Sequence, residues 1–221
     1  LKQFHICKRM IKGATRRRTY KAIYRLLDRV SPVPFDCGTI CGKACCGVAE
    51  YNRATRDEDM GLYLYPGEDE LLKEDADWLN WSEETVEEDD IEEVDGLSAL
   101  FPPSFLQKKL CFVRCKDPLQ CHRAYRPLQC RLFPTLPHLV NAGTKKERLV
   151  LIWNDMDLPY LCPLIEDEVE LDKDWLATVY DVWQTLLEDP MVHDMVAMDS
   201  LDRMDDVGMP TVLWPKFRFH R

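Results

Sequence analysis

FDCGTICGKACCGVAE, residues 35–50, holds four cysteines within ten residues, and our prediction of the fold starts from it. The cysteines are spaced C-x3-C-x3-CC, with glycines between them. A helical pattern precedes the stretch and ends at SPVPF, because two prolines cannot continue a helix. We therefore expect an irregular loop that gathers thiols around a small centre.

The other cysteines are spread along the chain, and the second cluster reads C-x3-C-x5-C-x8-C. Clustered thiols in a chain with no apolar signal-like amino terminus indicate metal binding in the reducing cytoplasm more than disulfide bonding. Cys7 stands apart, and we interpret it as a core residue. The predicted metal ligands are the other nine: Cys37, Cys41, Cys45, Cys46, Cys111, Cys115, Cys121, Cys130 and Cys162.

Thiolates are soft ligands, so they favour zinc, copper(I) or an iron-sulfur cluster over calcium or magnesium. A closed zinc site and a [4Fe–4S] cluster both take four thiolates, and the number of cysteines does not separate these two. The adjacent Cys45 and Cys46 cannot easily reach one small ion together. The sequence therefore predicts a polynuclear site with two or more metal atoms.

Arginines surround the second cluster, and guanidinium groups offset the negative charge of metal-bound thiolates from outside the ligand shell. We predict this supporting role for Arg126 and Arg131, which flank Pro127 and Cys130. His122 is adjacent to Cys121, but the cysteines already suffice as ligands.

The charge distribution restricts the partners. The formal net charge is −10, which argues against general nucleic-acid binding. Residues 1–29 nevertheless hold ten Lys or Arg and one acidic residue, whereas residues 57–95 hold eighteen Asp or Glu and one Lys. These segments either are solvated or neutralise each other, and a protein partner for the basic segment stays open. The longest apolar run, LVLIW, is far too short to cross a membrane.

Hydrophobic periodicity predicts two long helices, one over residues 15–30 and one over residues 172–190, with a second short helix at 192–204. Residues 147–155 read as a core strand, while the second cysteine cluster shows no period. We expect a mainly α fold with irregular Cys-rich loops, α+β at most with few short strands, whose helices pack around the polynuclear metal centre.

The chain reads as one domain, 1–221. It begins with a basic helical segment, 1–34, and ends with a helical segment, 166–221. Between them lies the metal-binding region, 35–165, with a mobile or edge acidic insertion at 82–96.

Five segments together resemble the bacterial YkgJ-like CxxCxxCC family of zinc- or iron-chelating proteins: FDCGTICGKACC, YLYPGEDELL, LCFVRC, CHRAYRPLQCRLFP and LCPLI. The most specific is YRPLQCRLFP, residues 125–134. The resemblance implies metal-site roles for all the predicted ligands except Cys115, supported by Arg126, Pro127 and Arg131.

These patterns favour a metal-binding protein that coordinates two or more zinc or iron atoms through cysteine thiolates. The cysteine pattern is also distantly similar to that of flagellin lysine methylases. An iron-sulfur enzyme or redox protein is thus the alternative, with a methylase-like activity on proteins as one form of it. The chain has no Gly-rich nucleotide loop, so we expect no nucleotide cofactor, and the balance is against an enzyme.

Overall fold

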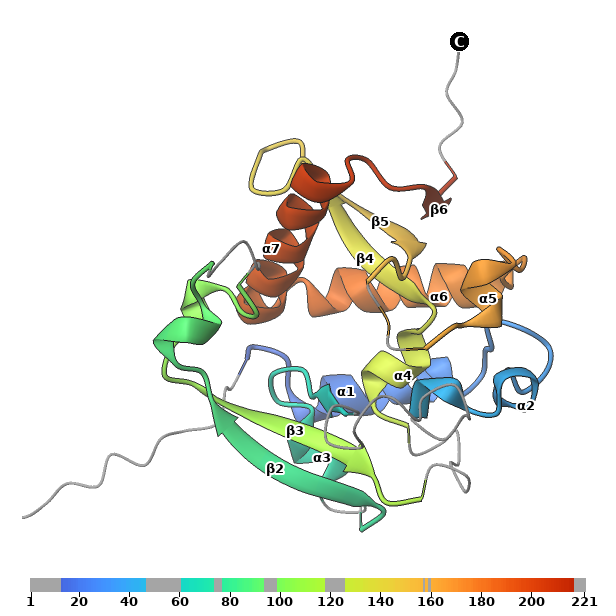
Figure 1. The fold of residues 1–221 in the computed structure, drawn as a ribbon, viewed down its shortest axis with the longest axis horizontal. Helices are drawn as coiled ribbons and strands as arrows, with labels where there is room; N and C mark the ends of the chain where they lie inside the picture. Colours follow the sequence, from blue (N-terminus) through green and yellow to red (C-terminus); the bar gives the residue numbers. More distant parts are fainter. Residues whose placement is uncertain are drawn as a thin grey trace, which may run out of the picture.

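Two three-stranded antiparallel sheets and the helices between and beside them form the structure (Figure 1). It is a computed structural model that describes residues 13–46, 61–73, 77–93, 99–117, 126–156, 158 and 160–216. The fold is mixed α/β, so the prediction of a mainly α fold with helices packed around a polynuclear metal centre is wrong. Some segments rich in cysteine and proline show no hydrophobic periodicity, yet they form strands. Strand pairing depends on a partner far away in the sequence, so a local pattern does not predict it.

The first sheet has the strand order β1-β3-β2. Its edge strand β2 exposes Ser82, Glu83 and Glu84, and like charges on an edge discourage pairing with another chain. The acidic insertion predicted at 82–96 thus begins as an edge strand, and its residues 94–96 lie outside the described residues. The strands are β1 (Leu62–Tyr63), β2 (Leu79–Thr85) and β3 (Lys109–Cys115).

The second sheet has the order β4-β5-β6 and contains the predicted core strand as its centre. Pro137 lies in β4, which is an edge strand and has only β5 as a neighbour. A proline is tolerated there because its missing N–H can face away from the sheet. The strands are β4 (Thr135–Val140), β5 (Arg148–Trp153) and β6 (Val212–Trp214).

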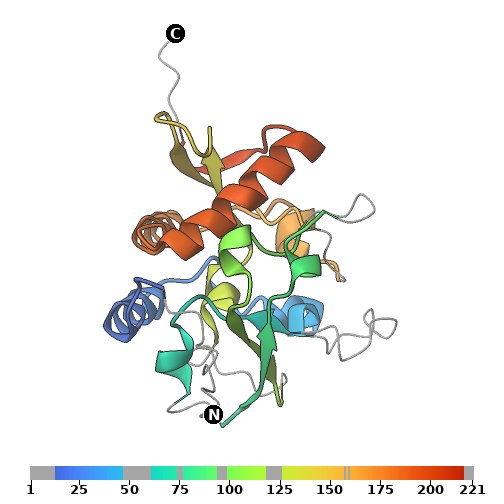
Figure 2. The same ribbon diagram turned by 90° about the vertical axis from the view of Figure 1, so that its left-hand side faces the viewer.

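Two long helices pack on the second sheet, and a third joins them to the first part of the chain. α1 (Arg17–Leu27) packs on α6 (Lys173–Leu186), which contacts β5 and β6, and α7 (Pro190–Asp206) contacts β4. Figure 2 shows α1 and α6 end-on, side by side. The predicted helices are confirmed, with α7 longer than expected because Pro190 begins it. Every described helix is too short or too polar to cross a lipid bilayer.

Short helical turns carry most of the cysteines and the connections. They are α2 (Gly38–Cys41), η1 (Ala44–Cys46), α3 (Asp69–Leu72), η4 (Glu88–Asp90), η5 (Pro103–Phe105), α4 (Leu128–Leu132) and α5 (Pro163–Glu166). In both views α2 and α5 lie side by side, at the right in Figure 1, although more than 120 residues separate them in sequence.

The fully buried carboxylate of Glu68 joins α1 to two of these short segments. Its Oε1 accepts hydrogen bonds from the Tyr24 hydroxyl at 2.5 Å and from the Leu128 backbone N–H at 2.8 Å. Its Oε2 accepts one from the Tyr65 backbone N–H at 3.1 Å. Burial raises the pKa of Glu68, while these hydrogen bonds and nearby Arg131 favour the charged form. The carboxylate therefore connects α1, the β1–α3 turn and the start of α4.

Glu68→Gln should lower the free energy of unfolding by about 2 kcal/mol, because one buried backbone N–H is left without an acceptor. Either orientation of the new amide points its NH2 group at Tyr65 N–H or at Leu128 N–H. Urea unfolding measures the loss. Glu70→Gln makes the same chemical change at an exposed position of α3 and should change stability by less than about 0.5 kcal/mol. Equal stability of both variants would contradict the role of Glu68.

His138 on β4 is fully buried, and neither ring nitrogen has a hydrogen-bond partner among the described residues. Burial lowers its pKa, Arg203 on α7 lowers it further, and Asp155 opposes them. The folded protein therefore holds this imidazole neutral at a pH at which the unfolded chain already binds a proton.

Acidification should destabilise the fold through His138. Below pH 6.5, the ordinary pKa of histidine, the imidazole gains a proton in the unfolded state but not in the folded state. The free energy of unfolding therefore decreases as the pH decreases. In His138→Leu this contribution is absent, and the stability difference from wild type should shift in favour of the variant by about 1 kcal/mol between pH 6.5 and pH 5.5. Thermal unfolding across that range measures the shift, and parallel pH profiles would contradict it.

Candidate metal centre

The structure brings together three of the predicted ligands, Cys37, Cys41 and Cys162, from opposite ends of the metal-binding region. Cys37 and Cys41 lie one helical turn apart on α2, where the Cys41 thiol donates a hydrogen bond to the Cys37 carbonyl oxygen at 3.8 Å. Cys162 immediately precedes α5. Besides burial, the charges of Cys41 and Cys162 raise the pKa of Cys37, and the charge of Cys41 raises that of Cys162, so the three thiols share one neighbourhood.

The turn around α2 explains why the sequence concentrates glycine here. Asp36 accepts a hydrogen bond from the Gly38 N–H at 3.2 Å and begins the turn. Gly42 ends the helix with φ at +61°, a left-handed conformation that glycine adopts without a steric cost, and Lys43 follows with φ at +62°. The chain therefore reverses sharply and leads directly into η1, which carries Cys45 and Cys46.

Cys162 is buried at the start of α5, and Pro163 occupies the first helical position. Burial raises the pKa of the Cys162 thiol, while the backbone N–H groups of Leu164 and Ile165 favour the thiolate. A metal bound to this sulfur would use the same amide groups to stabilise its negative charge.

Arg126 lies beside the first of these thiols. Burial raises the pKa of Cys37, and the Arg126 guanidinium partly offsets this effect. The same guanidinium lies 3.9 Å from the carboxylate of Asp36. This position suits the predicted role of Arg126, which is to balance thiolate charge from outside the ligand shell.

Arg131 contacts the end of α1 and the backbone just before α4. Its guanidinium stacks 4.2 Å from the centre of the Tyr24 ring and forms an ion pair with Asp28 at 2.6 Å. Its Nε donates to the Arg126 carbonyl oxygen at 2.8 Å. Arg131 thus fixes the backbone from which Arg126 extends. Burial raises the pKa of Tyr24 and Tyr65, and the charge of Cys130, next to Arg131 on α4, adds to the rise in both, so Cys130 lies near these tyrosines.

Cys111 and Cys115 occupy β3, on the same face of the strand. Residues four apart in a strand are separated by about 13 Å, so these two thiols cannot bind one metal ion. Burial raises the pKa of Cys111 to about 11, and a hydrogen bond with Lys73 opposes the rise. Lys73 also forms an ion pair with Asp69 at 3.3 Å. The surroundings of Cys111 are thus those of a polar cluster beside the sheet.

The remaining predicted ligands differ in how far the structure describes them. Cys45 is exposed. The side chain of Cys46, and all of Cys121 and His122, lie outside the described residues, as does Cys7. Among the residues that the structure describes, no group of three or more His, Cys, Asp or Glu side chains is arranged to hold a metal ion.

Soft thiol donors fit zinc or an iron-sulfur centre, which take four ligands, and Cys37, Cys41 and Cys162 share a neighbourhood without forming a ligand group in this structure. A complete centre needs a further thiol from Cys45, Cys46, Cys121 or Cys130. The bound metal would supply the charge that replaces the thiol protons.

Reasoning from the sequence missed three charged residues that shape the surroundings of the predicted ligands. Asp36 directly precedes Cys37. Because Arg126 is predicted to lie near the thiols, this position could have indicated a contact between Asp36 and Arg126. Glu68 follows a Pro-Gly turn within the quoted YLYPGEDELL segment, but nothing in the sequence shows that it is buried. Lys73 is separated from Cys111 by 38 positions, and only strand pairing brings them together.

Comparison of the chain with known protein families, curated proteins and solved structures found no match. The resemblance to the YkgJ-like family therefore stays a prediction.

Zinc binding should release protons and should tighten as the pH rises. Because burial raises the pKa of Cys37 and Cys162, both thiols are protonated in the metal-free protein at neutral pH. Cys37 and Cys162 together should release two protons per zinc ion, the other ligating thiols add to that number, and binding should tighten about tenfold per pH unit for each proton released between pH 6 and pH 8. Calorimetry in buffers of different ionisation enthalpy measures the release. An affinity that does not change with pH would contradict it.

Proposed function

We propose that this protein binds zinc or iron through a cysteine centre built on Cys37, Cys41 and Cys162. The observation that carries the proposal is that Cys162, at the start of α5, lies near enough to Cys37 and Cys41 at α2 for their charges to interact, although residues 42–161 lie between the two elements. Burial of Cys162 and the adjacent Arg126 add support. Neighbouring cysteines complete the ligand set and provide for a second metal atom.

In this proposal each part of the chain has a defined task. The thiolates bind the metal, and the Arg126 guanidinium and the amides at the start of α5 offset their charge. Arg131 and Glu68 hold α4, and so Arg126, in position. Metal ligation would also fix short turns that have little regular structure of their own, so its free energy contributes to folding.

The resemblance to YkgJ-like proteins becomes part of the proposal for a spatial reason. The quoted segments include α2 and η1, the β1–α3 turn, α4 and the start of α5. Glu68 joins the second of these segments to the third, and the thiols join the first to the last. This convergence supports a common metal-binding design. We assign the protein to the cytoplasm, where thiols stay reduced and available to metals.

Cys162→Ser should remove most of the bound metal and lower the melting temperature by more than an ordinary core substitution, because it deletes a buried ligand. Cys111→Ser is the matched control: the resemblance counts Cys111 among the metal-site positions, but its buried thiol lies beside Lys73, so the proposed centre leaves it out and this variant should keep its metal. Elemental analysis and thermal unfolding of anaerobically purified protein measure both effects.

Two outcomes would overturn the proposal. One is less than one metal atom per chain in protein purified with and without air. The other is equal metal loss in the two variants. A colourless zinc protein would indicate zinc sites, whereas iron with broad visible absorption would indicate an iron-sulfur centre and favour the enzyme or redox alternative.

A further inference from the structure

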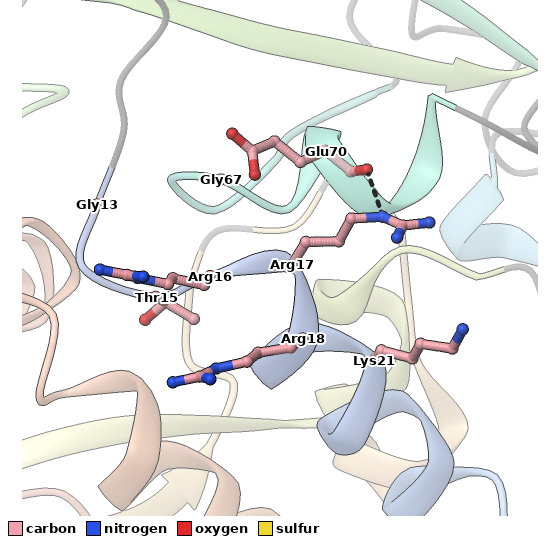
Figure 3. Close-up of a pocket in the computed structure, with 8 residues that line it drawn as sticks. All are labelled: Gly13, Thr15, Arg16, Arg17, Arg18, Lys21, Gly67 and Glu70. Carbon is pink, nitrogen blue, oxygen red and sulfur yellow. Dashed lines mark hydrogen bonds between the residues drawn. The ribbon is translucent and has the colours of Figure 1, made fainter.

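A pocket of about 570 Å³ opens at the amino end of α1, within the size range of small-molecule sites (Figure 3). Four cationic side chains line it: Arg16, Arg17, Arg18 and Lys21. The turn at Gly67 and the neighbouring Glu70 form the opposite wall. The pocket is independent of the cysteine centre described above.

The placement of these cations is contrary to the electrostatics of a helix. The positive end of the helix dipole and the unbonded first-turn N–H groups lie at the amino terminus, where acidic residues are favourable. α6 follows this rule, with Asp172 as its cap and Asp174 in its first turn. α1 instead begins with three consecutive arginines and has no acidic residue in its first turn. A bound anion would remove this repulsion.

Most of these cations are not neutralised within the fold. Arg16, Arg18 and Lys21 form no ion pair or hydrogen bond through their side chains with the described residues. Arg17 is held by the Glu70 backbone carbonyl, which accepts from its Nε at 3.2 Å. In Figure 3 the backbone carbonyl of Glu70 faces Arg17, whereas the side-chain carboxylate of Glu70 points away from it. Glu70 therefore contacts the pocket through this backbone carbonyl.

Thr15 supplies a second, independent indication of a ligand. The residue is only 9% exposed and lines the pocket, and its hydroxyl, which forms no hydrogen bond with the described residues, stays accessible to a ligand or to water. Its backbone N–H is fixed by the buried carboxylate of Asp189 at 2.8 Å. Gly67 has φ at +85°, and a Cβ there would lie 2.9 Å from the Thr15 carbonyl oxygen. The pocket is therefore formed by closely packed backbone.

We propose that this pocket binds the phosphate group of a small phosphorylated molecule. Guanidinium groups donate paired hydrogen bonds to phosphate oxygens, and a dianion matches several unpaired cations better than a single carboxylate does. The Thr15 hydroxyl and the first-turn N–H groups of α1 are further donors. The concave shape and the net charge of −10 favour a small ligand over an RNA strand.

Calorimetric titration of the purified protein with inorganic phosphate, ribose 5-phosphate and ribose tests the proposal. Wild type should bind both phosphates and not ribose. The relative affinities separate free phosphate from a phosphate monoester as the ligand. Arg16→Gln/Arg18→Gln should weaken phosphate binding tenfold or more, and Thr15→Val should weaken it by a smaller factor. Arg25→Gln/Arg29→Gln removes the same charge from exposed positions outside the pocket and should change binding less than twofold.

Three results would overturn the proposal. The first is no phosphate binding at about 10 mM ligand. The second is an equal loss in the control variant, which would indicate attraction by overall charge. The third is tighter binding of single-stranded oligouridylate that both double variants weaken, which would indicate an extended nucleic-acid surface. Circular dichroism checks that each variant is folded, and Lys21→Gln, at an exposed position, replaces any variant that is not.

Discussion

The structure depends on a buried carboxylate. Glu68 loses its hydration completely, and three hydrogen bonds from α1, from its own turn and from α4 compensate for that loss. Because each donor comes from a different segment, the carboxylate is stable only when all three are in place. It therefore fixes the position of α4, and with it Cys130 and the approach of Arg126 to Cys37.

Arg131 is the complement of this carboxylate. Its guanidinium covers the Tyr24 ring while the Tyr24 hydroxyl donates to Glu68, so one aromatic side chain links the two charges. The ion pair with Asp28 and the bond to the Arg126 carbonyl extend the network to the end of α1 and to the thiols. A buried network of this kind specifies one arrangement, because a half-satisfied one is costly.

The two proposed sites lie at different ends of this framework. The thiols gather where α2 meets α5, and the cationic pocket lies where α1 meets the β1–α3 turn. The segment 61–73 contributes to both, since Glu68 positions α4 and Gly67 forms a wall of the pocket. One turn of the chain thus carries structural constraints for both sites, which explains its dense mixture of proline, glycine and acidic residues.

The sequence alone contained the local features. Apolar residues three and four positions apart predicted α1 and α6, and an apolar run predicted β5. Clustered thiols indicated soft-metal chemistry. All of these signals come from residues that are close together in the sequence. It did not contain the pairing of β3 with β2, the burial of Glu68 or the meeting of Cys37 with Cys162. Those depend on segments far apart in the chain, whose contacts form only when desolvation and hydrogen bonding are satisfied together. The tertiary structure therefore decided which thiols meet, and it separated Cys111 from Cys115 by placing both on one extended strand.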